Sequence, residues 1–413
     1  MVAFIHKKTM RRVVITGMGI YSSLGKDKSE VKDSLFAGKS GIIFAPERKE
    51  FGFRSALTGF VERPDLSSKL SRRQRISMGE ESEYAFVATE EALKQALITE
   101  ETFNNQPIGL IYGNDSVSKA VVESIDIVRA KKDTTLVGSG AIFKSMNSSV
   151  TMNLATIYKI LGINMTVSAA CASGSHSIGL GYLFIKQGLQ DIVICGGAQE
   201  TNPYSMASFD GLGVFSTLEE SPTLASRPFD KNRDGLVPGG GAATLILEEY
   251  ESAVKRGAPI LGEILSYGFS SNGEHISTPN VDGPVSAMQM ALEQAQMKAD
   301  QIEYINAHAT STPIGDANEA KAIAKLFGSV PYVSSTKSMT GHECWMAGTS
   351  EIVYSLLMAH HGFIAPNINL EEIDDSAKEL SLVKTTLKQN FNVFLSNSFG
   401  FGGTNSALII RKI

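Results

Sequence analysis

The chain has 413 residues, of which 43% are hydrophobic and 20% are charged, a balance typical of a globular protein with a sizeable core. Its formal net charge of -5 gives no general attraction to nucleic acid or to an anionic membrane, so neither is expected as a partner. The three cysteines are too few for a disulfide framework and are typical of a protein from a reducing compartment.

The first apolar run begins at Val13 and is interrupted at Thr16 and Gly17. This interruption favours a buried strand over the apolar segment of a secretory signal. No later stretch approaches the about 20 consecutive apolar residues that a membrane-spanning helix requires. We therefore expect a cytoplasmic protein that does not insert into membranes.

Short apolar segments typical of buried strands alternate with helical patterns along the chain. The predicted strands cover residues 12–17, 108–112, 165–168, 191–195, 242–247, 304–307, 332–334, 392–395 and 407–410. The predicted helices cover residues 80–97, 176–187, 284–297, 317–326 and 350–361. This alternation predicts an α/β fold with buried, largely parallel sheets. Because no long polar linker interrupts it, we expect one fused body.

One order of elements occurs twice, in residues 165–197 and again in residues 332–362. Each copy has a strand that ends in Val-Ser, a turn of small residues and a helix. Cys171 lies in the turn of the first copy, and His342 lies just beyond the turn of the second. The repeat predicts an internal duplication and a site drawn from both halves. The predicted halves cover residues 1–255 and 256–413.

Cys171 is a candidate nucleophile because a predicted helix follows its turn directly. The free N–H groups and the dipole at a helix N-terminus favour a thiolate, and the same N–H groups can hold an oxyanion. A lone buried cysteine is more often structural, and the spacing by itself leaves both interpretations open. Cys195, inside an apolar run, fits the structural interpretation better.

Two histidines follow predicted strands in the second half. His308 begins a polar loop that contains Thr310 and Thr312, and His342 lies five residues after Lys337. A lone histidine usually has a hydrogen-bonded structural role. Two histidines in matching positions, with a cysteine at the related turn of the first half, favour a joint site instead. No zinc-type spacing such as HExxH or CxxC is present, so no metal is expected.

Other features of the second half allow more than one interpretation. Asp316 and Glu319 open a predicted helix, where acidic residues suit the helix dipole, so capping explains both. A cysteine-dependent hydrolase would use one histidine as its base, with an orienting Asn or Asp. Residues 399–406 are rich in glycine and carry Phe399 and Phe401, either as a hinged loop beside an apolar channel or as simple packing.

Four segments, taken in chain order, carry a family resemblance. They are VSAACASGSHSIG, NAHATSTPIGDANEAKAI, SSTKSMTGH and SNSFGFGGTNSALIIRK, and further similarity at the start and in the middle extends the resemblance over nearly the whole chain. Together they resemble the β-ketoacyl-acyl-carrier-protein synthases of the thiolase superfamily, most closely the elongating type I and II enzymes. The resemblance implies a thiolase-like, five-layer αβαβα fold built from two similar halves, a homodimer and no cofactor.

The resemblance also implies a mechanism. Cys171 would accept an acyl chain from acyl carrier protein, and malonyl-carrier protein would then lose CO2. His308 and His342, both neutral, would donate hydrogen bonds to the oxygen of the resulting enolate. The enolate would attack the acyl thioester and give a β-ketoacyl product two carbons longer. The backbone N–H groups of Cys171 and Phe401 would hold the oxyanion of that attack.

The remaining matched positions support this site. Lys337 falls on a lysine that assists the histidine pair electrostatically, and Glu319 falls on a structural glutamate. Thr310 and Thr312 match the threonines that bind the pantetheine arm in the family. Phe401 and Phe209 match aromatic residues of its acyl pocket. The densest basic cluster resembles a docking patch for the acidic carrier protein and consists of Lys69, Arg72, Arg73 and Arg75. A weaker extension would be Arg129, Lys131 and Lys132, although such runs are commonly solvated helix faces.

The sequence departs from the family pattern at several positions. Residues 343–346 (Glu-Cys-Trp-Met) follow His342 where the family has small residues, and Ser173 replaces the usual Thr after the nucleophile. Ala309 replaces a common Gly, and residues 114–118 replace a glycine-rich stretch of the acyl pocket. These departures leave the acyl-chain preference open, and a ketosynthase of a specialised polyketide or polyene pathway is the alternative. A chain-length factor would lack the nucleophile, and a thiolase would bring a second catalytic cysteine near the C-terminus.

Overall fold

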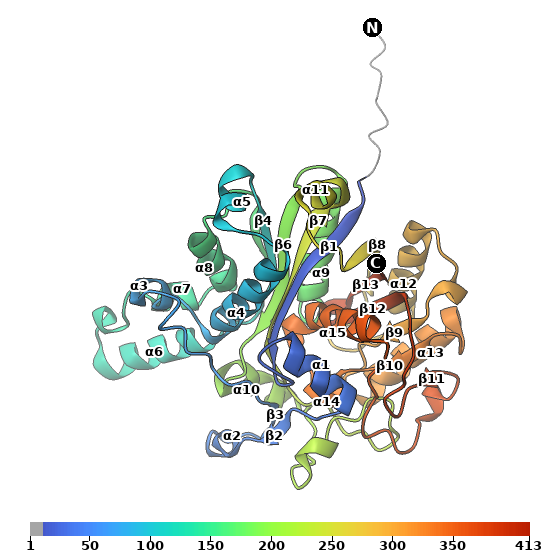
Figure 1. Cartoon of the computed structure of the whole chain (residues 1–413). Coiled ribbons are helices and arrows are strands. Elements are labelled where there is room, and N and C mark those ends of the chain that lie inside the picture. The colour runs from blue at the N-terminus through green and yellow to red at the C-terminus, as the bar shows by residue number, and fades with distance from the viewer. Residues whose placement is uncertain (1–10) are drawn as a thin grey trace.

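The computed structural model describes residues 11–413, and the first ten positions of the predicted N-terminal half lie outside the described residues. Within the described part, no helix is long and apolar enough to cross a membrane. Eleven strands form one mixed sheet, and a hairpin of β2 (Ile42–Phe44) and β3 (Leu57–Gly59) lies apart from it. Figure 1 shows the long strands in the middle of the molecule with helices on both sides.

The two parts of the sheet have the same arrangement, except that the C-terminal part has one additional edge strand, β11. The N-terminal part has the order β5-β4-β6-β7-β1 and consists of β1 (Val13–Ser22), β4 (Gly109–Gly113), β5 (Asn164–Val167), β6 (Ile192–Gln199) and β7 (Gly241–Glu249). The C-terminal part has the order β11-β10-β9-β12-β13-β8 and consists of β8 (Gly262–Ser271), β9 (Tyr304–Asn306), β10 (Tyr332–Ser334), β11 (Ser381–Leu382), β12 (Val393–Gly400) and β13 (Thr404–Lys412). Only three residue pairs between β1 and β8 join the two parts.

The sheet is less parallel than predicted. β4 is parallel to β5 and β6, and β9 is parallel to β10 and β12, but β1, β7, β8 and β13 add antiparallel pairs. Three residues connect β12 to β13, which is too short for a crossover, so these strands must run antiparallel. β8 was missed because its glycines and serines interrupt any apolar run, and its pairing with β1 and β13 defines it.

Six helices complete the layers. α4 (Glu80–Gln95) and α8 (Ser149–Tyr158) pack on the outer face of the N-terminal strands. α12 (Asp282–Ala295) and α13 (Pro313–Phe327) pack on the outer face of the C-terminal strands. α9 (Ser173–Lys186) and α15 (Ala347–His361) lie between the halves, in a core built from both. The predicted five-layer αβαβα arrangement is confirmed.

The order of elements repeats between the halves. It is β1-α4-β4-α8-β5-α9-β6-β7 in the first and β8-α12-β9-α13-β10-α15-β12-β13 in the second. The other helices are α1 (Lys28–Ala37), α2 (Pro46–Glu50), α3 (Arg72–Arg75), α5 (Glu100–Asn105), α6 (Lys119–Lys131), α7 (Ala141–Lys144), α10 (Pro203–Leu212), α11 (Tyr250–Arg256) and α14 (Lys337–Thr340). The repeat supports an internal duplication. The division at residues 255 and 256, in the last turn of α11, stays a prediction.

Candidate active site

Cys171 lies in a tight turn between β5 and α9. Ala170 has a φ of 47°, a left-handed conformation that is uncommon for a residue other than glycine. Ser173 fixes this turn, because its Oγ accepts a hydrogen bond from the N–H of Ala169 (2.8 Å) and donates one to the carbonyl of Ala170 (2.6 Å). The serine therefore supplies a turn-holding hydroxyl at the position where the resembled family usually has threonine.

The glycine-rich end of β12 approaches this turn closely. A Cβ atom at Gly400 would lie 3.0 Å from the carbonyl oxygen of Ala169 and 3.3 Å from the nitrogen of Cys171, so a side chain here would crowd the turn. The approach brings the backbone N–H of Phe401 to the Cys171 sulfur, which the N–H of Cys171 itself also contacts. Two N–H donors thus converge on the sulfur from the two halves of the chain.

The Cys171 thiol is more basic than the sequence suggests. Burial raises its pKa to about 12, while the positive charge of Lys337 and the two backbone N–H groups lower it only in part. The backbone N–H groups at the helix N-terminus act in the expected direction, but their effect on the pKa is smaller than that of burial. The side chain is 5% exposed, and removing it from water outweighs the helix terminus.

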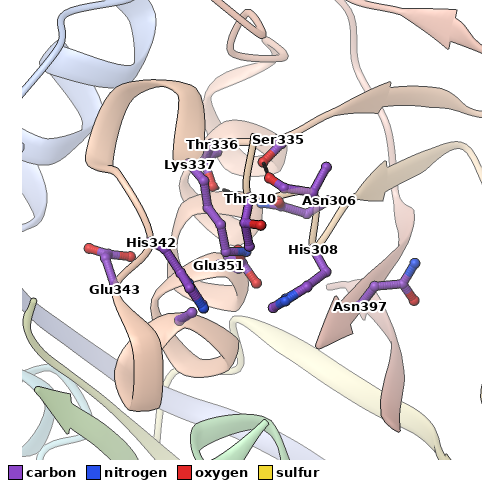
Figure 2. Close-up of polar contacts among 12 residues, drawn as sticks. Asn306, His308, Thr310, Ser335, Thr336, Lys337, His342, Glu343, Glu351 and Asn397 are labelled. Atoms are coloured by element: carbon purple, nitrogen blue, oxygen red, sulfur yellow. Dashed lines mark hydrogen bonds and ion pairs between the residues drawn. The ribbon is translucent and has the colours of Figure 1, made fainter. Parts of the chain in front are cut away.

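His308 follows β9, and His342 follows α14. Their ring centroids are 5.3 Å apart with the rings nearly perpendicular, and Figure 2 shows the two side chains pointing toward one another. Within residues 11–413, Nδ1 of His308 and both ring nitrogens of His342 have no hydrogen-bond partner. Burial lowers the pKa of both imidazoles well below the usual value, and the charge of Lys337 lowers it further. The pair is therefore neutral at physiological pH and is free to donate to a ligand.

Lys337 lies behind the histidines and is 1% exposed. Its ammonium group is paired with the carboxylate of Glu351 on α15, as Figure 2 shows. Glu351 was not predicted. The sequence offered one signal, because Glu351 is the only acidic residue of a mainly apolar helix, and a charge that becomes buried requires a partner.

Glu319 holds the loop that carries His308. Its carboxylate accepts hydrogen bonds from the N–H groups of His308 (2.9 Å) and Ala309 (2.6 Å), and from the side-chain amide of Asn397 (3.0 Å). Capping does not explain this residue, because α13 begins at Pro313 and Glu319 lies in its second turn, fully turned inward. Neither Asn397 nor this bonding pattern was predicted, since it depends on strand β12 lying beside β9.

A cavity of about 530 Å³ gathers most of the predicted residues. Its lining includes Cys171, Phe209, His308, Thr310, Thr312, Glu319, His342 and Phe401. The two threonine hydroxyls are 3.1 Å apart, and the rings of Phe209 and Phe401 stack with centroids 5.9 Å apart. Lys337 does not line the cavity and acts on it only through its charge.

The predicted docking residues lie elsewhere. Lys69, Arg72 and Arg73 are exposed in and just before α3, and Arg75 is half-buried with its Nε donating to the carbonyl of Leu70 (3.2 Å). Figure 1 places α3 beside α7 on the N-terminal half, far from α13 at the cavity. The second basic cluster is exposed at the end of α6 and is formed by Arg129, Lys131 and Lys132.

Comparison with known proteins identifies the family. Residues 10–253 match the model of the beta-ketoacyl synthase N-terminal domain, and residues 261–371 match that of its C-terminal domain. The chain belongs to the β-ketoacyl synthase family. This ketoacyl synthase is 42% identical over 408 residues to the 3-oxoacyl-[acyl-carrier-protein] synthase 1 of Escherichia coli (strain K12), which covers 98% of this chain and 100% of that relative.

Solved structures of ketoacyl synthases have the same fold. A beta-ketoacyl synthase from Burkholderia phymatum has a TM-score of 0.92 at 36% identity and covers 98% of this chain and 100% of that chain. A type II polyketide ketosynthase, solved in complex with its acyl-carrier protein, has a TM-score of 0.88 at 28% identity with the same coverage. The resemblance read from the sequence motifs is thereby confirmed.

The pKa of Cys171 predicts how this ketoacyl synthase reacts with iodoacetamide. Because only the thiolate reacts and the pKa is about 12, we expect Cys171 alkylation to accelerate about tenfold per pH unit from about pH 7 to pH 10. Peptide mapping by mass spectrometry measures the rate of Cys171 alkylation at each pH. Replacing the buried pair together, as Lys337→Met with Glu351→Gln, is expected to slow the reaction because it removes a charge that lowers this pKa. A plateau below about pH 9 would show that the site stabilises the thiolate after all.

Proposed function

We propose that this ketoacyl synthase is a 3-oxoacyl-[acyl-carrier-protein] synthase, an acyltransferase that elongates fatty acyl chains by decarboxylative condensation. The observation that carries the proposal is one cavity lined by a buried thiol and two neutral histidines whose ring nitrogens are largely unpartnered in the described chain. A hydrolase would instead orient one histidine as a base toward the thiol. The similarity to E. coli 3-oxoacyl-[acyl-carrier-protein] synthase 1 over the whole chain supports the fatty acid substrate.

The proposed reaction has two stages. The Cys171 sulfur attacks the thioester carbonyl of acyl-carrier protein, the acyl group moves to the sulfur, and the carrier thiol leaves with the proton. The N–H groups of Cys171 and Phe401 hold the oxyanion of the tetrahedral intermediate. Malonyl-carrier protein then enters, the bond to its carboxylate breaks, and CO2 leaves behind an enolate.

His308 and His342 donate hydrogen bonds to the enolate oxygen, which is why both must be neutral and carry a proton on the nitrogen facing it. The enolate carbon attacks the acyl carbonyl on Cys171, and the cysteine leaves as a thiolate, which takes up a proton from water. Lys337 supports the neutral state of the histidines, and Glu319 positions His308. For the substrate, Thr310 and Thr312 bind the pantetheine arm, and Phe209 and Phe401 cover the acyl end.

Incubation of the purified protein with acyl-carrier protein and malonyl-carrier protein tests this proposal. We expect CO2 release and a β-ketoacyl-carrier protein two carbons longer than the starting chain, detected by intact-protein mass spectrometry. A chain extended through several rounds without any reduction of its keto groups would favour a specialised polyketide function. Failure to consume malonyl-carrier protein with any acyl chain would contradict the proposal.

We further propose that acyl carrier protein docks on the basic patch of Lys69, Arg72, Arg73 and Arg75. The double charge reversal Arg72→Glu with Arg73→Glu is expected to raise the KM for carrier protein about tenfold, with kcat nearly unchanged, because exposed charges mainly govern encounter. Lys384→Glu with Lys388→Glu makes the same charge change at exposed lysines elsewhere and is the matched control. Equal KM values for the two double variants would show that the carrier protein does not dock on this patch.

A homodimer is the expected assembly, in the cytoplasm. β5 is an edge strand paired only with β4, and such edges require cover. Apolar side chains are exposed on β5, on α6 and on α7, namely Met165, Val121, Val122, Ile125, Ile142 and Phe143. The open strand edge and these exposed apolar side chains support pairing with a second copy.

A further inference from the structure

The turn that follows His342 places a tryptophan beside the nucleophile. The 3₁₀ turn η4 (Cys344–Met346) carries Trp345, which is 4% exposed. It packs in one apolar cluster with Cys171, and the other buried members are Phe53, Met206, Phe215, Leu236 and Cys344. The ring of Phe209 bridges cluster and cavity, with centroids 6.1 Å from Trp345 and 6.3 Å from Phe215. Trp345 is therefore part of the apolar wall next to Cys171.

The open space around Cys171 borders this cluster on one side but does not reach Trp345. Cys171, Phe209 and Leu236 line the cavity, whereas Met206, Phe215 and Trp345 do not. The cavity instead continues past the histidines and the threonine loop, where the pantetheine arm is proposed to lie. An acyl chain on Cys171 that turns toward the apolar side meets space already filled by side chains.

The backbone of this turn is fixed from two sides. The carboxylate of Glu343 accepts hydrogen bonds from the hydroxyls of Ser350 and Tyr354 on α15. On the other side, a Cβ atom at Gly174 or Gly197 would lie 2.9 or 2.7 Å from the carbonyl oxygen of Trp345, so α9 and β6 press directly against it. A turn held in this way cannot withdraw its indole by a backbone shift, because densely packed cores resist such movement.

We propose that Trp345 sets the length of acyl chain that Cys171 can carry, so that this synthase elongates short chains and rejects long ones. The inference rests on the proposed function and concerns the substrate class of the same site. Trp345 is buried in the apolar cluster that contains Cys171, so the indole occupies volume beside the sulfur that an acyl chain could otherwise fill. Inserting methylenes into a filled and rigid core is unfavourable, and the penalty grows with each group that does not fit.

The test compares kcat/KM for acyl-carrier proteins that bear four-, eight- and twelve-carbon chains. For the native protein we expect the four-carbon chain to be preferred over the twelve-carbon chain by about a hundredfold. Trp345→Ala is expected to reduce this preference about tenfold or more, and Trp345→Phe is expected to give an intermediate value. Intact-mass analysis of the acyl group on Cys171 should show the same shift toward longer chains.

Phe86→Ala is the matched control, because it removes a buried aromatic ring from α4 in a different core cluster. We expect Phe86→Ala to lower the free energy of unfolding about as much as Trp345→Ala does, but to keep the chain-length preference of the native protein. If Trp345→Ala does not fold, Trp345→Phe and Trp345→Leu decide the question. Equal use of four- and twelve-carbon chains by the native protein, or an unchanged preference in the folded variants, would overturn the inference. Condensation of no chain at all would instead refute the proposed function.

Discussion

Cys171→Ala is expected to abolish condensation, lowering the rate at least about a thousandfold, because no other thiol lines the cavity in the described chain. The acyl group would have no acceptor, and intact-mass analysis should find no acyl adduct. The change removes one sulfur atom, so the free energy of unfolding should change by less than about 1 kcal/mol. Light scattering should report the same molar mass as for the native protein.

The control for this variant is Cys195→Ala, which removes a second buried thiol from the core between the halves, away from the cavity. It should retain condensation and acyl loading. An active Cys171→Ala protein, or an acyl group found on Cys344 instead, would show that Cys171 is not the nucleophile. A monomeric native protein would contradict the proposed assembly without touching the chemistry.

Replacing either histidine should separate the two stages of the reaction. His308→Ala and His342→Ala are each expected to slow malonyl decarboxylation about 10²- to 10³-fold, the usual effect of losing one donor to a developing oxyanion. Loading of Cys171 from acyl-carrier protein should suffer less, because we propose that the backbone N–H groups of Cys171 and Phe401, and not the histidines, hold the thioester carbonyl. Release of labelled CO2 measures the first effect, and the mass of Cys171 measures the second.

His361→Ala provides the matched control, since this exposed histidine ends α15 and does not line the cavity. It should leave both stages unchanged. Because the pKa of both site histidines lies well below the usual value, native decarboxylation should show no histidine-dependent loss of rate down to about pH 6. A decarboxylation rate that falls with decreasing pH, with an apparent pKa of about 6.5, would mean that the histidines are not buried neutral donors.

The features that local sequence determines were predicted well. An apolar run followed by small residues places Cys171 at the start of α9 whatever surrounds it, and the strands before His308 and His342 are fixed in the same way. The repeated order of strand, turn and helix also follows from periodicity within each segment. These signals act over a few residues, so the sequence alone carries them.

Other features depend on which segments meet. The partner of Lys337 is Glu351 on another helix, and no spacing in the sequence indicates that pair. The parallel or antiparallel direction of the strands, and β8 itself, are defined by neighbours far away in the chain. Likewise the side chains that enclose Trp345 come from several separate segments.

The protonation states of the site residues also depend partly on the sequence and partly on the tertiary structure. The sequence determined that a cysteine and two histidines occupy related turns of a duplicated α/β chain. Only the tertiary structure decided that the thiol has a raised pKa and the histidines lowered ones, because the exclusion of water is a property of the assembled layers. A helix terminus can be recognised within a few residues, but burial is a sum over everything that packs around a group.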